Sequence, residues 1–195
     1  MSTTLNKFQI DKLGNTLIYL SKNVGDFGKT KILKLLFLLE EKSIKDFGVP
    51  FFGFDFEVWQ YGPVVEQIFE DLNGTHNPFL NSYIQRASWN PDEFEAIAEF
   101  NDDEFSNNDI YLMEKIINLA RHKTAKNLVD ITYGEGSLWR KTAKENGVLD
   151  KFEAKTLTKT NILIDFTTVL ENDGYLKERY EGALDFLQFT KQIKS

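Results

Sequence analysis

Cysteine is absent from the sequence, and this absence excludes disulfides, thiolate zinc sites, iron–sulfur clusters and thiol nucleophiles. Histidine is scarce, since His76 and His122 are the only two, and most metal sites and catalytic triads would lack their usual ligand or base. The turn composition around His76 indicates a solvated loop residue. His122 lies at the end of a predicted helix, where the helix dipole favours a cation. We therefore expect no metal, no cofactor and no enzymatic activity.

Long hydrophobic segments are also lacking. The longest apolar run covers residues 35–39 and is flanked by Lys34 and Glu40, whereas a membrane-spanning helix needs about 20 apolar residues. Polar residues dominate positions 6–12, where a signal peptide would have its apolar region. We therefore expect a cytoplasmic protein that does not bind a membrane.

Bulky apolar residues, in contrast, are plentiful. Of the 195 residues, 42% are hydrophobic and 14% are aromatic, including 17 phenylalanines, whereas disordered chains are poor in such residues. A chain of this length buries roughly 70% of the surface that its unfolded form exposes, which provides a core without disulfides or metals. We expect residues 1–195 to form a single domain.

The net charge of −7 is concentrated in the middle of the chain. Residues 51–113 hold 13 acidic residues and one base, Arg86, whereas residues 1–50 and 114–195 have net charges of +3 and +2. No base interrupts residues 92–109. This stretch is either an ordinary solvated surface or a docking surface for a basic partner, because a patch of one sign attracts its complement. Either surface would repel a phosphate backbone, so nucleic acid is not the expected ligand.

Periodicity predicts two helices and a strand in the first third of the chain. Asn6 and Gln9 form a capping-box pattern that predicts a helix over residues 7–23. A second helix, capped by Thr30 and ended by Gly48, is apolar on several faces and is therefore expected at the centre of the core. Aromatic residues then alternate with others over residues 52–58, as in a strand.

The remaining pattern predicts further helices. Pro63 is placed at the first position of a helix that Asn73 and Gly74 end, and a second strand over residues 79–89 pairs with the first. The other helices are expected over residues 91–100, 107–122 (capped by Ser106 with Asp109), 125–132, 138–146, 160–172 and 176–193. The expected fold is mainly α with a small β-sheet (α+β), a compact helical domain of seven to nine helices and a two- or three-stranded sheet.

Three blocks occur in order at residues 31–37 (KILKLLF), 48–52 (GVPFF) and 56–65 (FEVWQYGPVV). With them the chain resembles the Panacea domain family, which includes the antitoxin SocA and phage-associated GepA-like proteins. A fourth block near residues 128–139 departs from the family pattern, since Tyr133 replaces a histidine and Leu138 replaces a proline. The resemblance covers about residues 8–145, and the helices of residues 146–195 are expected to pack on that part.

The resemblance implies an antitoxin that binds and neutralises a cognate toxin encoded beside it. A resemblance to SocA itself implies a different mechanism, in which the antitoxin is an adaptor that delivers its toxin to the ClpXP protease. A DNA-binding or phage-associated regulatory protein without enzymatic activity is the alternative, and local positive charge supports it. The bases concerned are Arg121, Lys123, Lys126, Arg140, Lys141 and Lys144.

Candidate residues follow from both lines of reasoning. The phenylalanines after the second helix lie in a turn and strand start where not all can be buried, and such rings are enriched in interface cores, so burial and a partial interface role are both open. The residues predicted to contact a partner are Phe51, Phe52, Trp59, Tyr61, Asp102, Asp103 and Glu104. The residues predicted to build the fold are Lys34, Leu35, Gly62, Pro63 and Trp139. The neighbouring carboxylates Asp102–Asp103 and Glu40–Glu41 do not form an acid pair, because adjacent side chains point to different sides.

Overall fold

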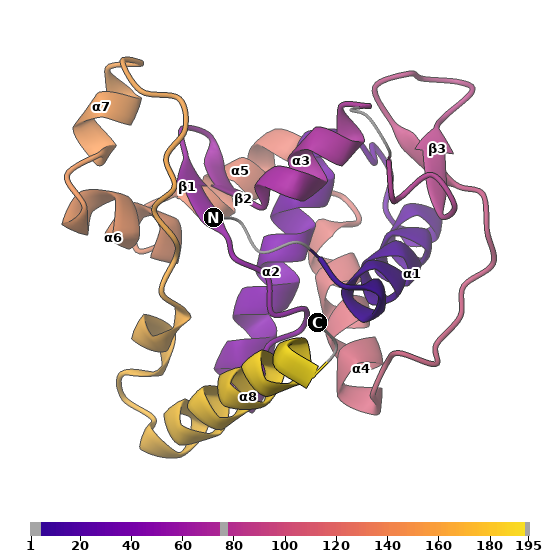
Figure 1. Cartoon of the computed structure of the whole chain (residues 1–195). Coiled ribbons are helices and arrows are strands. Elements are labelled where there is room, and N and C mark those ends of the chain that lie inside the picture. Colours follow the sequence, from indigo (N-terminus) through magenta and orange to yellow (C-terminus); the bar gives the residue numbers. More distant parts are fainter. Residues whose placement is uncertain (1–4, 75–77, 194–195) are drawn as a thin grey trace.

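The computed structural model describes residues 5–74 and 78–193, and it confirms the expected α+β class. Helices predominate, and they surround one central helix, α2 (Figure 1). The helices in the described part are α1 (Lys7–Asn23), α2 (Lys29–Phe47), α3 (Glu66–Leu72), α4 (Asn107–Ala120), α5 (Ala125–Tyr133), α6 (Leu138–Glu145), α7 (Leu149–Glu153), the 3₁₀ helix η1 (Phe166–Leu170) and α8 (Gly174–Ile193). The strands are β1 (Glu57–Trp59), β2 (Gly62–Val64), β3 (Ile84–Arg86) and β4 (Phe94–Ala96).

Helix α2 occupies the centre that its several apolar faces predict. It contacts α3, α4, α5, α8, β2 and η1. Gly48 ends it in the left-handed conformation (φ 62°), as expected, and a Cβ at this position would lie 2.6 Å from the Leu176 carbonyl oxygen of α8. The expected Thr30 cap is wrong, because the chain already enters the helix at Gly28, whose extended backbone takes the N-cap position.

The two predicted capping boxes are both present. Asn6 and Gln9 cap α1, and Ser106 and Asp109 cap α4, each pair exchanging two hydrogen bonds. The helices of residues 125–132, 138–146 and 176–193 correspond to α5, α6 and α8. Local signals of start and stop therefore located most of the helices.

The strand pairing differs from the prediction. Residues 52–56 are not part of a strand, and β1 pairs antiparallel with β2 in a tight hairpin. Pro63 lies inside β2 opposite Val58, and α3 begins only at Glu66. The position suits a proline, which has no N–H to donate. The Val58 N–H points away from β2 and donates to the Ile162 carbonyl (2.9 Å), so Val58 and Pro63 face each other without a hydrogen bond between them.

The acidic helix predicted for residues 91–100 is wrong. Its residues form β4, which pairs with β3, so β3 does not pair with β1. The Phe94 N–H donates to the Phe27 carbonyl (3.0 Å), and the Phe94 side chain is buried. These long-range contacts outweigh a local helical pattern, since a helix this short is marginal without packing.

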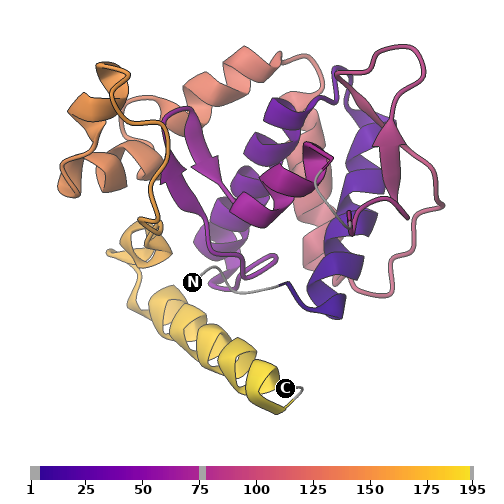
Figure 2. The same cartoon turned by 45° about the horizontal axis from the view of Figure 1, so that its top comes forward.

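The helix predicted for residues 160–172 is also wrong. The segment before η1 is extended along the outer edge of β1, and it hydrogen-bonds through Thr158, Ile162 and Ile164 to Gln60, Val58 and Phe56. Only residues 166–170 are helical, as η1, whereas α7 was not predicted. Figure 2 shows this C-terminal part wrapping past the hairpin before α8.

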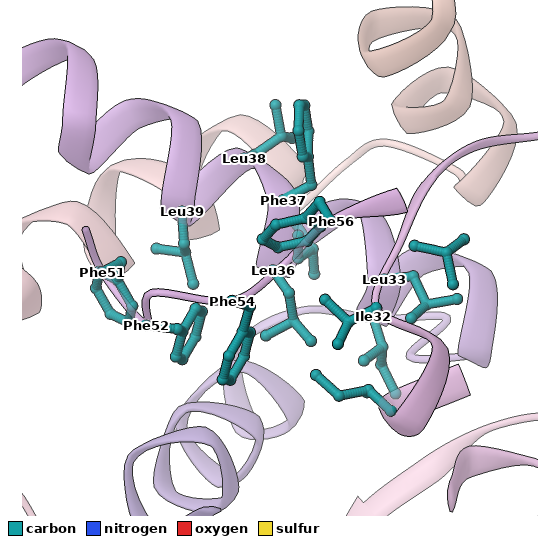
Figure 3. Close-up of a cluster of buried hydrophobic side chains, with 14 of the residues drawn as sticks. Ile32, Leu33, Leu36, Phe37, Leu38, Leu39, Phe51, Phe52, Phe54 and Phe56 are labelled. Carbon is teal, nitrogen blue, oxygen red and sulfur yellow. The ribbon is translucent and has the colours of Figure 1, made fainter. Parts of the chain in front are cut away.

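The core confirms the burial of Leu35 and Trp139 and corrects the expectation for the phenylalanines. Phe51, Phe52 and Phe54 all have at most 5% of their surface exposed. They pack along α2 in the segment that follows it (Figure 3), and the Phe52 and Phe54 rings stack at 4.6 Å. All three can be buried because the N–H groups of Phe52 and Gly53 hold this segment against the Glu40 carboxylate of α2. In the described part of the chain, no helix is both long and apolar enough to cross a membrane.

Candidate functional site

Lys34 is a buried cation at the hairpin. It projects from α2 with only 2% of its surface exposed, and its Nζ donates to the Pro63 carbonyl oxygen (3.2 Å). A Cβ at residue 62 would lie 2.7 Å from that Nζ, and Gly62 has a φ of 105°. Only glycine therefore fits both the turn and the approaching ammonium.

The ammonium of Lys34 has few partners. Burial lowers the pKa of Lys34 to about 7, because the charged form loses its hydration. A lysine ammonium can donate three hydrogen bonds, and in the described residues it donates one, to Pro63. Lys31, one turn earlier on α2, is equally buried but donates to two carbonyls, those of Gly25 (2.6 Å) and Lys123 (2.7 Å).

Lys34 lines a pocket of about 400 Å³ between α2, the β1–β2 hairpin and α3. Most of its surface is apolar, and Lys34 lies at its buried end. Lys159, with 56% of its side chain exposed, lies at the open end, 5.2 Å from the centre of the Trp59 ring. We call this the hairpin pocket. Its principal walls are Leu33, Trp59, Val64 and Phe69.

The open end of the hairpin pocket carries compensated charge. Lys159 forms an ion pair with Glu66, and the charges of Glu57 and Glu70 also stabilise its ammonium. Lys29 lies 4.7 Å from the centre of the Phe69 ring. Three carboxylates of the protein therefore lie near the exposed Lys159. The lowered pKa of Lys34, in contrast, is caused by burial.

Trp139 fixes the hairpin from the other side. It is fully buried, and its Nε1 donates to the Trp59 carbonyl oxygen (3.0 Å). Tyr133 stacks on it with ring centres 4.2 Å apart. Three of the four blocks that carry the family resemblance thus meet at one place, because Lys34, Pro63 and Trp139 each come from a different block. The sequence marks these residues as structural but gives no sign of the cavity between them.

The acidic segment of residues 97–109, which ends in the first turn of α4, is fixed along α1. Glu99 pairs with Lys22 (3.0 Å), and Asp109 pairs with Lys12 (3.3 Å). Between them, the Asn101 N–H donates to the side chain of Asn15 (2.8 Å). Two of the segment's carboxylates are therefore neutralised by bases of α1.

The predicted acidic residues lie in the middle of this segment. Asp102 and Asp103 are exposed and Glu104 is half-buried. None of the three forms an ion pair with another described residue, although Asp103 accepts a hydrogen bond from Asn101 (3.1 Å). We call residues 102–104 the acidic loop.

The seven residues predicted to contact a partner do not form one surface. Phe51 is buried, with its ring 4.5 Å from the Lys12 ammonium and 6.4 Å from the Phe105 ring, so it supports the acidic loop from inside. Tyr61, at the tip of the hairpin, is 67% exposed, and Trp59 is half-buried. The hairpin and the segment that contains the acidic loop lie on opposite sides of α2 and α1 (Figures 1 and 2).

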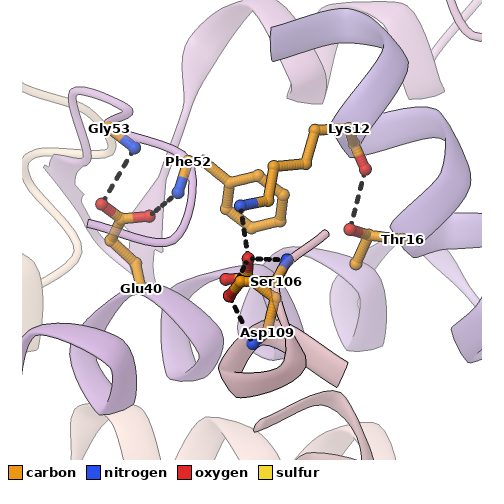
Figure 4. A network of polar contacts seen from close by, with 7 residues as sticks. All are labelled: Lys12, Thr16, Glu40, Phe52, Gly53, Ser106 and Asp109. Carbon is orange, nitrogen blue, oxygen red and sulfur yellow. Dashed lines mark hydrogen bonds and ion pairs between the residues drawn. The ribbon is translucent and has the colours of Figure 1, made fainter. Parts of the chain in front are cut away.

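Glu40 is the buried acid of α2, in addition to the buried bases Lys31 and Lys34. Its two carboxylate oxygens accept from the N–H groups of Phe52 (2.7 Å) and Gly53 (3.1 Å), as Figure 4 shows. Burial raises the pKa of Glu40 to about 7 despite these hydrogen bonds and the nearby Lys12. This carboxylate anchors the phenylalanine segment to α2, a role that its sequence neighbourhood did not reveal.

Part of the basic cluster considered for DNA binding is compensated. Arg140 pairs with Glu153 (3.0 Å), and Lys141 pairs with Glu171 (2.8 Å). His122 is exposed just after α4, whose C-cap is Arg121, whereas His76 lies outside the described residues. Within those residues, no group of three or more His, Asp or Glu side chains is placed to hold a metal ion.

Comparison with known proteins places the chain in a family. The family model described as antitoxin SocA-like, Panacea domain, matches residues 32–140, from the start of α2 to α6. No curated protein and no solved structure is similar enough to match. The matched range is more than half of the chain, and it contains the β1–β2 hairpin, Lys34 and Trp139. The chain belongs to the antitoxin SocA-like, Panacea domain family.

Proposed function

We propose that the protein is an antitoxin that neutralises a cognate toxin by direct contact. The observation that carries this proposal is the family match over residues 32–140. The elements within that range pack around α2, which is compatible with a protein that works by binding.

The acidic loop is the proposed docking surface for a basic region of the toxin. Two features support it. Asp102 and Asp103 are exposed without an ion pair among the described residues, and the surrounding residues 51–113 have only one base, Arg86. A patch of one sign accelerates encounter with a partner of the other sign. The buried Phe51 and Phe52 are not part of this surface.

The decisive experiment is co-expression with the product of the neighbouring reading frame. We expect the protein to restore growth to cells that express this product, and the two proteins to co-purify. Restored growth without a detectable complex would contradict neutralisation by direct contact.

Charge reversal tests the surface itself. We expect the double variant Asp102→Lys, Glu104→Lys to slow association about tenfold at low salt, with a smaller loss at high salt, because screening weakens steering. The control is Asp130→Lys, Glu145→Lys on α5 and α6, which changes the net charge equally. An equal loss in the control would assign the effect to net charge and remove the acidic loop from the proposal.

Delivery to a protease is a finer version of the same function. A toxin that is degraded in the presence of this protein and ClpXP, and is stable without either, would identify an adaptor. A toxin that stays at constant level while growth is restored would identify sequestration.

A further inference from the structure

We propose that the hairpin pocket binds a monocarboxylate with an aromatic or branched aliphatic body, whose carboxylate pairs with the ammonium of Lys34. This activity is separate from toxin neutralisation and does not depend on it. Two sources share this chemistry: a free small acid and the carboxyl-terminal residue of a polypeptide.

The first step concerns the hydrogen-bonding capacity of Lys34. Its side chain is buried and lines the cavity, and its ammonium has one acceptor, the Pro63 carbonyl, among the described residues. A buried charge is costly unless it is paired and hydrogen-bonded. A carboxylate in the pocket would supply both the counter-charge and the missing acceptors, and charge-assisted hydrogen bonds of this kind are strong.

The second step concerns the body of the ligand. Beyond Lys34 the walls are the side chains of Leu33, Trp59, Val64 and Phe69. A cavity of about 400 Å³ is at the lower end of the size range of ligand sites. It suits a body of about one ring or one large side chain, which would cover the apolar walls.

The third step concerns the charge of the ligand. Lys29 and Lys159 line the open end of the pocket, and Lys159 is paired with Glu66, with Glu57 and Glu70 close by. These three carboxylates outnumber the two exposed lysines and oppose a second negative charge on the ligand. A single carboxylate that reaches Lys34 is therefore favoured over a phosphate or another dianion.

Lys31 shows what a purely structural buried lysine looks like on the same helix. It has two carbonyl acceptors and does not line the hairpin pocket. Lys31→Met is therefore the matched control for Lys34→Met, because both changes remove a buried ammonium from α2.

The experiment uses the full chain and four probes: phenylacetate, phenylacetamide, phenyl phosphate and N-acetylphenylalanine. Binding is measured by calorimetry and by the fluorescence change of Trp59, which lines the pocket. We expect at least one carboxylate to bind with a Kd below about 10 mM, and its neutral or dianionic analogue to bind about tenfold more weakly. Tighter binding of N-acetylphenylalanine points to a chain terminus, and tighter binding of phenylacetate to a free acid.

The variants assign the site. Lys34→Met is expected to weaken carboxylate binding about tenfold or more, and Lys31→Met to leave it unchanged. Circular dichroism verifies that each variant is folded. Equal binding of acid and amide, tighter binding of phenyl phosphate, no saturable binding of either carboxylate, or an equal loss in Lys31→Met would each overturn the proposal. The comparison of acid, amide and phosphate uses the unaltered chain and decides the matter even where a variant fails to fold.

Discussion

Lys34 lies toward the first end of α2 and Glu40 toward its last, and these two buried charges differ in how they are satisfied. Glu40 accepts two backbone N–H groups and holds the phenylalanine segment in place. Lys34 has one acceptor and lines a cavity. Burial brings the pKa of both groups to about 7, from opposite directions. A displaced pKa therefore does not distinguish a structural charge from one available to a ligand, whereas unused hydrogen-bonding capacity beside a cavity does.

The largest expected effects are opposite pH dependences at the two ends. The pKa of Glu40 is raised from 4.5 to about 7, so the folded protein binds more protons and loses stability as pH rises from 4.5 to 7. The pKa of Lys34 is lowered from 10.5 to about 7, so the folded protein binds fewer protons and gains stability as pH rises from 7 to 10.5. Each unit of displacement corresponds to about 1.4 kcal/mol.

Urea denaturation across these pH ranges tests both signs. The free energy of unfolding of the unaltered chain is compared with that of Glu40→Gln below pH 7 and of Lys34→Met above it, because titrations common to both proteins cancel. A constant difference between chain and variant through either range would show that the group keeps an ordinary pKa.

Removing the Glu40 carboxylate comes next in size. We expect Glu40→Ala to lower the free energy of unfolding by about 3 kcal/mol, because the N–H groups of Phe52 and Gly53 lose their acceptors in a buried place. Glu40→Gln keeps one side-chain oxygen and is expected to cost less. Chemical denaturation measures both, and equal losses would mean that neither the packing of this side chain nor the oxygen that Gln retains stabilises the fold.

A smaller effect is expected at the hairpin. Gly62→Ala would place a Cβ 2.7 Å from the Lys34 Nζ in a backbone with φ 105°. We expect a loss of about 2 kcal/mol from the strained backbone and the displaced ammonium. Gly136→Ala is the control, since Gly136 also has a positive φ but open space around it. Equal losses in thermal unfolding would attribute the effect to the backbone alone.

The smallest effect, and of opposite sign, is expected for Lys34→Met. At pH 7 this variant should be about 1 kcal/mol more stable than the unaltered chain, because replacing a poorly paired buried charge by an apolar side chain is commonly neutral or stabilising. A loss comparable to that of Glu40→Ala in the same denaturation assay would make Lys34 a structural residue like Glu40 and remove the difference between the two ends.

Local patterns predicted the elements whose causes are local. The capping boxes at Asn6 and Ser106, the several apolar faces of α2 and the burial of Trp139 could all be read from the sequence. The acidic helix failed because the partners of β4, including Phe27, are distant in sequence. The helix predicted over residues 160–172 is wrong for another reason. Threonine, isoleucine and phenylalanine alternate with a period of two over residues 158–166, which is the pattern of an extended segment.

Only part of the candidate site could be predicted from the sequence. Lys34 interrupts an apolar run, which marks it as unusual, and the Gly62–Pro63 turn is recognisable. The cavity between them arises from the relative placement of α2, α3 and the hairpin, which no local pattern encodes. In the same way, the exposure of Asp102 and the burial of Phe51 depend on how residues 97–109 lie along α1.

The placement of Pro63 in β2 also protects the protein from aggregation. An exposed strand edge recruits strands of other molecules through its free N–H and C=O groups. At the outer edge of β2, Pro63 has no N–H to offer, and its carbonyl oxygen is occupied by Lys34. The outer edge of β1 is covered by residues 158–164. Neither side of this small hairpin therefore offers a template for intermolecular pairing.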